Sequence, residues 1–110
     1  MEMPELLRRL NRQPGVRGSL VLTSDGIPVH CEIPAPLDIE TVAAGVGSCV
    51  RSLAGERRYS RIVVTPSVGR LALIDASDSW VVVLLDESTQ IELASLMRLL
   101  RGGDDDRALT

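Results

Sequence analysis

Apolar residues follow a helical spacing in some stretches of the chain and a strand-like spacing in others. Residues 5–10 carry leucines at helical spacing behind Pro4, and proline suits the first position of a helix. The apolar stretches 18–23 and 27–33 flank Asp25-Gly26, a dipeptide that strongly indicates a tight hairpin. The pattern therefore predicts a short helix followed by two antiparallel strands.

A long second helix is predicted next. The Pro-Ala-Pro segment 34–36 ends the second strand, and Asp38 is a candidate N-cap. Helical spacing continues to about residue 54, and Gly55 is a suitable stop. On a helical wheel, the core side of this helix carries Ile39, Val42, Val46, Cys49, Val50 and Leu53.

A meander of three strands and a last helix complete the pattern. Turn-rich segments separate three apolar runs, which are residues 61–65, 71–74 and 80–85. Ser88 is the predicted cap of a helix over residues 90–100, which Gly102 and Gly103 terminate. We expect a single domain over residues 1–103 and an acidic, disordered tail over residues 104–110.

The strands differ in how apolar they are, and this predicts the order of the sheet. Residues 80–85 are apolar throughout, as in a strand covered on both faces, and 18–23 has a similar apolar centre. If these two strands meet in the middle, the order is 2-1-5-4-3, with 27–33 and 61–65 at the edges. Pro28 fits an edge because proline cannot donate to a sheet ladder. We therefore predict an α/β fold, an α+β sandwich on a five-stranded antiparallel sheet, with elements in the order α-β-β-α-β-β-β-α.

Composition and charge exclude several kinds of partner. Aromatic residues make up only 2% of the chain, which leaves little to stack a flavin, haem or nucleobase. All twelve basic residues are arginines interspersed with acids, at a net charge of −3, so we expect no nucleic-acid partner. No apolar run approaches the ~18 residues of a membrane span. Cys31 and Cys49 lie outside any metal-binding spacing, which suits a reducing compartment. We expect a cytoplasmic protein without membrane insertion.

Residues 24–32, SDGIPVHCE, gather an aspartate, the only histidine, a cysteine and a glutamate. Strand alternation assigns the core face to Ile27, Val29, Cys31 and Ile33 and the solvent face to Pro28, His30 and Glu32. A Cys–His nucleophile pair needs both side chains on one face, and a structural zinc site needs four ligands. We therefore expect neither a metal site nor a catalytic pair here.

Motifs for catalysis or cofactor binding do not occur in the sequence. Neither a phosphate-binding GxxxxGK[ST] loop nor a GxSxG or HExxH motif is present. Gly45 and Gly47 fall inside the predicted second helix rather than in a loop that follows a strand. We expect a protein that is not an enzyme and that has no cofactor.

Residues 14–29, PGVRGSLVLTSDGIPV, resemble the "pGV.Ga.lv..dG.pv" signature that opens roadblock (dynein light chain roadblock type) domains. The order of elements also resembles that family, and the apolar runs 69–73 and 80–85 are similar to its later strands. The resemblance covers roughly residues 6–100. Because an arginine-only basic complement is typical of a GC-rich genome, we expect a prokaryotic member.

This resemblance implies a longin/profilin-like fold that forms a homodimer through the third strand and the second helix. It further implies a non-enzymatic adaptor or regulator of a Ras-like small GTPase, acting through activation, exchange or localisation. A small-ligand sensor, or a structural scaffold without a GTPase partner, is the alternative. The shortage of aromatic residues and of polar clusters disfavours the sensor.

The residues themselves also favour a dimer. Residues 62–64 are apolar on both faces of a predicted edge strand, and only Arg61 and Pro66 guard its ends. A flank of small residues on the second helix adjoins its core side and permits close approach of another backbone. The predicted dimer interface comprises Ala43, Gly47, Val50, Ala54, Ile62, Val63 and Val64.

The side of the second helix that faces away from the core is nearly free of charge. Glycine in a helix interior costs about 1 kcal/mol relative to alanine, so helix propensity does not explain Gly45 and Gly47. We therefore expect a partner, the GTPase, to pack on this face. The predicted partner-binding residues are Thr41, Ala44, Gly45, Ser48, Arg51 and Ser52.

A basic cluster follows the second helix, formed by Arg57, Arg58 and Arg61 around Tyr59. The first interpretation is that Arg57 and Arg58 complement the dipole at the helix C-terminus, worth about 0.3–1 kcal/mol when exposed. The second interpretation is that the cluster contacts an acidic partner at the rim of an interface.

Overall fold

The computed structural model of the protein describes residues 3–87 and 92–101. Within these residues, helices and strands occur in the predicted order. They are α1 (Met3–Asn11), β1 (Val16–Thr23), β2 (Pro28–Glu32), α2 (Ile39–Ser52), β3 (Arg61–Thr65), β4 (Gly69–Asp75), β5 (Ser79–Leu85) and α3 (Leu93–Arg101).

The five strands form one antiparallel sheet in the order β2-β1-β5-β4-β3, which confirms the predicted topology. β5 lies at the centre, and its residues from Trp80 to Leu85 are all buried. In the register, Val21 lies opposite Val81 and Leu73 lies opposite Val82. β5 is apolar from Trp80 to Leu85 because helices cover both faces of the sheet around it.

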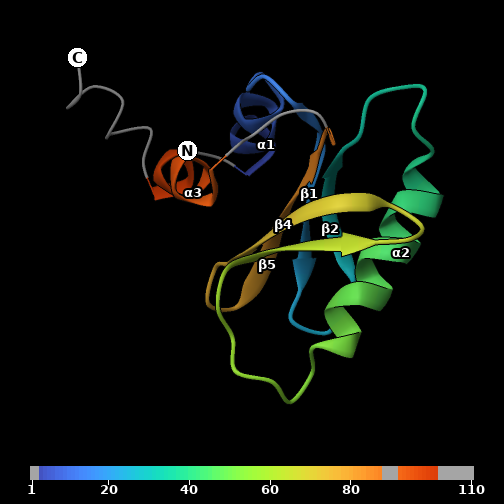
Figure 1. Ribbon diagram of the computed structural model, residues 1–110, viewed down its shortest axis with the longest axis vertical. Helices are drawn as coiled ribbons and strands as arrows, with labels where there is room; N and C mark the ends of the chain where they lie inside the picture. Colours follow the sequence, from blue (N-terminus) through green and yellow to red (C-terminus); the bar gives the residue numbers. More distant parts are fainter. Residues whose placement is uncertain (1–2, 88–91, 102–110) are drawn as a thin grey trace.

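The helices cover the sheet from two sides (Figure 1): α2 lies on one face, and α1 and α3 lie on the other. Strand residues therefore alternate between two cores. The core below α2 includes Leu20, Leu22, Val42, Val46, Val50, Leu73, Val82 and Leu84. The core below α1 and α3 includes Leu7, Leu10, Val21, Ile74, Val81, Val83 and Leu96.

α1 is fastened to the β1–β2 edge by polar contacts. The buried Ser19 hydroxyl donates to Asn11 Oδ1 at 2.7 Å, and Asn11 Nδ2 donates to the backbone oxygen of Glu32 at 2.9 Å. Arg8 Nη1 lies 3.2 Å from Glu32 Oε1. Glu32 therefore contacts α1, whereas the strand alternation had predicted that it faces open solvent, and His30 is half-buried.

β2 departs from simple alternation. Val21 pairs with His30 whereas Leu22 pairs with Pro28, so Val29 is an extra residue in the ladder. This β-bulge reverses the faces on its N-terminal side. Val29 is 54% exposed and Ile27 is 59% exposed, so the prediction that both face the core is wrong.

Element ends differ from the predictions at several points. α2 ends at Ser52 with Leu53 as its C-cap, about two residues early, and Gly55 follows in a left-handed conformation with φ of 89°. Ile39 was expected in the core, but it begins the helix and is 46% exposed. α3 begins at Leu93. The predicted Ser88 cap, the stop at 102–103 and the tail 104–110 lie outside the described residues.

Candidate interaction surfaces

α2 begins at a well-formed cap and turns one bare face outward. Asp38 Oδ1 accepts a hydrogen bond from the backbone N–H of Glu40 at 3.2 Å, and Asp38 Oδ2 accepts one from Thr41 Oγ1 at 2.7 Å, which confirms the N-cap. Valines at helical spacing fix the buried side of the helix. Of the six predicted partner-binding residues, Gly45 is half-buried and the exposed ones are Thr41, Ala44, Ser48, Arg51 and Ser52.

The two glycines of α2 are explained by packing within the chain. A methyl group on Gly45 would lie 2.5 Å from Val68 Cγ2 in the β3–β4 turn. A methyl group on Gly47 would lie 2.8 Å from the backbone oxygen of Gly26 in the β1–β2 turn. Both positions allow α2 to lie close to a turn of its own protomer. Packing within the chain therefore accounts for both glycines, so they do not by themselves indicate an external partner.

The same contacts orient the two flanks of α2. The Gly47 side faces the β1–β2 turn, and the Gly45 side faces the β3–β4 turn. Ala43 shares the Gly47 side, because residues four positions apart lie on one helix face, whereas Ala54 lies beyond the end of the helix. The side of α2 next to β3 is therefore the Gly45 side, opposite to the flank that the sequence had suggested.

The other predicted interface residues of α2 offer little surface. Val50 is only 2% exposed and belongs to the core below the helix. Gly47 is also buried, and Ala43 packs against the same core, whereas Ala54 is exposed. Any contact with a second copy through these four positions therefore depends mainly on Ala54, which follows the end of α2.

β3 is an edge strand with an apolar outer surface. It pairs only with β4 in the sheet. Val64 is 76% exposed and Ile62 is also exposed, whereas Val63 packs against the core below α2. The opposite edge, β2, is protected by Pro28 and by its bulge, two devices that hinder strand addition. β3 has neither device within its five residues.

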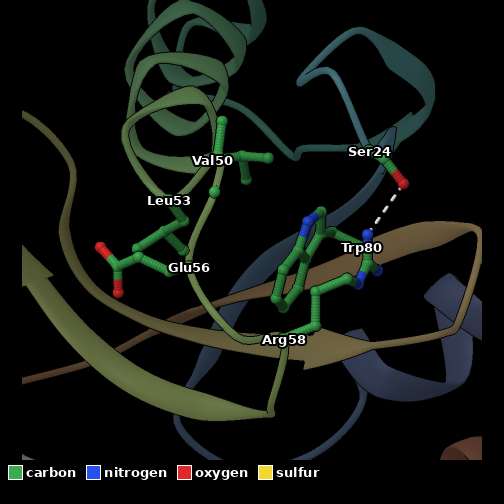
Figure 2. Close-up of a pocket in the computed structure, with 8 residues that line it drawn as sticks. Ser24, Val50, Leu53, Glu56, Arg58 and Trp80 are labelled. Atoms are coloured by element: carbon green, nitrogen blue, oxygen red, sulfur yellow. Dashed lines mark hydrogen bonds between the residues drawn. The ribbon is translucent and has the colours of Figure 1, made fainter.

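Arg58 forms a polar centre that joins three loops. Its Nε and Nη2 donate to Asp75 Oδ1 at 3.0 and 2.7 Å. Its Nη1 donates to Ser24 Oγ at 2.8 Å, the hydrogen bond that Figure 2 shows. Nη2 also donates to the backbone oxygen of Ser79 at 2.8 Å, and the guanidinium lies 4.4 Å from the centre of the Trp80 ring. The pKa of Asp75 is lowered, chiefly by the Arg58 hydrogen bonds and then by the N–H of Ser77. Arg58 is thus a structural anchor rather than a rim contact.

A pocket of about 220 Å³ lies between this centre and the end of α2. Figure 2 shows Val50 and Leu53 of the helix on one side and Trp80 and Arg58 on the other. Pockets for small ligands usually measure roughly 300–1,000 Å³. The pocket is small and its guanidinium is already engaged, so it does not favour the small-ligand sensor.

The rest of the basic cluster behaves differently. Arg61 stacks over the Tyr59 ring at 3.8 Å and lies 3.6 Å from Glu56 Oε1, so it is tied to its own loop. Arg57 is exposed. The sequence marked this cluster as basic, but only the fold distinguishes the anchored Arg58 from the solvent-facing Arg57.

The residues that suggested chemistry do not assemble into a site. Within residues 3–87 and 92–101, no three histidine, cysteine or acidic side chains are placed to hold a metal ion. Cys31 and Cys49 are free thiols, and burial raises the pKa of each, which disfavours the reactive thiolate.

No helix in the described part of the chain combines the length and apolarity that crossing a bilayer requires.

The fold and these surfaces define the class of protein, a small α/β sandwich with an unpaired apolar edge and a bare helix face. The family model of the Roadblock/LC7 domain matches residues 3–55. A crystal structure of a Roadblock/LC7 domain from Streptomyces avermitilis superimposes with a TM-score of 0.62 over 100% of both chains, at 17% identity, which supports the shared fold. Residues 3–55 thus match the Roadblock/LC7 domain family in sequence, and the whole chain has the fold of such a domain; Roadblock/LC7 domains are small adaptor-type regulatory domains.

Curated relatives of similar length occur in an archaeon. The uncharacterized proteins MJ0714 and MJ0310 from Methanocaldococcus jannaschii are 27% and 26% identical to this chain. Each alignment covers 94% of this chain, and it covers 92% of MJ0714 and 96% of MJ0310. These relatives agree with the expected prokaryotic member of the family.

Proposed function

We propose that the protein is a homodimeric, non-enzymatic adaptor that binds a Ras-like small GTPase and controls its activity or its position. The observation that carries the dimer is the contrast between the two sheet edges. β2 is blocked by a proline and a bulge, whereas β3 presents unpaired backbone groups beside the exposed Ile62 and Val64. A second copy of the chain is the natural cover for such an edge.

Two-fold symmetry and the faces of β3 define how the strands would pair. In an antiparallel pair, directly opposite residues point to the same face. A two-fold axis at Val63 places Ile62 of one copy opposite Val64 of the other and keeps all residues of β3 (Arg61–Thr65) in the ladder. The Ile62–Val64 contacts then form an apolar cluster on the face opposite α2. The exposed Val64 side chains gain most from this arrangement.

The GTPase would dock on the other face of the joined sheet. There the two α2 helices lie on the same side, each with its Gly45 flank toward the two-fold axis. Their exposed small residues, such as Ala44 and Ser48, allow a flat surface to approach closely. Roadblock domains are protein-interaction domains that often dimerise, which supports this proposal.

Two exposed valines at opposite edges of the sheet provide a matched test. Val64→Glu places a carboxylate against Ile62 of the second copy, while Val29→Glu makes the same change at the blocked β2 edge. Sedimentation equilibrium should give a dimer for the wild type and for Val29→Glu, and a monomer for Val64→Glu. Calorimetric titration with a Ras-like GTPase of the same organism should show binding only for the two dimers. A monomeric wild type at high micromolar concentration would refute the dimer, and a dimeric wild type that ignores the GTPase would refute the adaptor role.

A further inference from the structure

Arg51 is the only charged residue between Glu40 and Glu56. It is exposed on the open face of α2, where its neighbours on that face are small residues such as Ser48 and Ser52. In the described part of the chain, no hydrogen bond or ion pair engages its guanidinium. Beyond the acidic first turn at Glu40, the face therefore presents a single positive charge.

The Arg51 side chain lies close to two glycines. A methyl group on Gly26 would lie 3.1 Å from Arg51 Cγ and 3.5 Å from its Nη1. A methyl group on Gly47 would lie 3.2 Å from the same nitrogen. The stem and the guanidinium thus lie flat on the junction between α2 and the β1–β2 turn. A side chain supported in this way loses less conformational freedom on binding than one that extends freely into solvent.

We infer that Arg51 binds a carboxylate on the surface of the protein partner and determines which partner the α2 face accepts. The inference rests on the proposed adaptor function. A guanidinium pairs with a carboxylate through two parallel hydrogen bonds, so it supplies both affinity and orientation. The acid of α2 on this face, Glu40, lies eleven residues before Arg51, about 16 Å along the helix at about 1.5 Å per residue, too far to compete for its guanidinium.

The orientation of the side chain favours a surface carboxylate over a nucleotide phosphate. Arg51 lies against Gly26 and Gly47 and does not project from the helix. An arginine that reaches a nucleotide must extend into the pocket of the other protein. An aspartate or glutamate on a flat protein surface, in contrast, can approach a guanidinium that lies along α2.

The test compares the affinity of the GTPase for four forms of the full chain. These are the wild type, Arg51→Gln, Arg51→Lys and Arg12→Gln, the last removing one exposed charge next to α1 on the far side of the sheet. We expect Arg51→Gln to weaken binding about ten- to hundredfold and to flatten its dependence on NaCl concentration. Arg51→Lys keeps the charge but loses the paired hydrogen bonds, so its affinity for the GTPase should fall between that of the wild type and that of Arg51→Gln. Arg12→Gln should bind within about twofold of the wild type.

Each outcome distinguishes this inference from the proposed function. If the wild type does not bind the GTPase, the adaptor function fails and the inference falls with it. If the wild type binds and Arg51→Gln matches Arg12→Gln, only the inference is overturned. If Arg51→Gln loses an effect on GTP hydrolysis at unchanged affinity, the carboxylate assignment is overturned in favour of a phosphate. If Arg51→Gln fails to fold, a folded Arg51→Lys variant decides by the same affinity comparison.

Discussion

Substitution of Arg58 tests whether this single side chain stabilises the loops at one end of the sheet. We expect Arg58→Ala to destabilise the protein far more than Arg57→Ala, although the two arginines are adjacent and both were grouped as surface charge. Arg58 makes hydrogen bonds to Asp75, Ser24 and the backbone of Ser79, whereas Arg57 is exposed. The substitution leaves the partly buried carboxylate of Asp75 without its cationic partner.

The size of the effect follows from these contacts. A hydrogen bond to a charged group contributes about 1.5–3 kcal/mol when well shielded. The side chains of Arg58 and Asp75 are 30% and 27% exposed, so solvent screening lowers each contribution. The stacking on Trp80 adds about 0.5–1 kcal/mol. We expect a total loss of about 2–3 kcal/mol, against less than about 0.5 kcal/mol for Arg57→Ala.

Urea unfolding at one fixed protein concentration measures the difference, because a dimer would otherwise make stability depend on concentration. Far-ultraviolet circular dichroism should accompany the fluorescence of Trp80, since the substitution removes a group that touches this ring. Thermal melts should show a fall of roughly 10 °C or more for Arg58→Ala. Equal unfolding midpoints for the two alanine variants would refute the anchor role.

Two further predictions concern Asp75 and the α2 face. The pKa of Asp75 is lowered in the folded protein, so its stabilising contribution is present above the unfolded value and is lost as pH falls through the folded one. The stability gap between the wild type and Asp75→Asn should therefore shrink below about pH 4, and a gap that stays constant down to about pH 3 in urea titrations would contradict this. Ala44→Arg and Ser48→Glu place bulky charge on the open side of α2 and should weaken GTPase binding while the dimer stays intact by sedimentation. Unchanged affinity in both variants would exclude this face as the docking surface.

Local patterns in the sequence were sufficient to predict the order of helices and strands and the order of strands in the sheet. Asp25-Gly26 marks a tight turn, Asp38 caps a helix, and the unbroken apolar run of β5 requires cover on both faces, so the order 2-1-5-4-3 followed. The same patterns located β3 at an edge. These features depend on backbone conformation and on hydrophobic periodicity, which are properties of neighbouring residues.

The tertiary structure decided what each surface residue faces. Periodicity assumes a regular strand, so it could not reveal the bulge that turns Val29 outward. A helical wheel gives the angles between the side chains of α2, but it does not show which side of the helix contacts which turn of the sheet. Only the fold shows that Gly47 meets the β1–β2 turn and Gly45 the β3–β4 turn. Likewise, Arg57, Arg58 and Arg61 are close together in sequence but differ in their contacts. Of the three, only Arg58 pairs with Asp75, which is distant in sequence. Contacts between residues far apart in the chain arise from packing, and a single sequence carries no local signal for them.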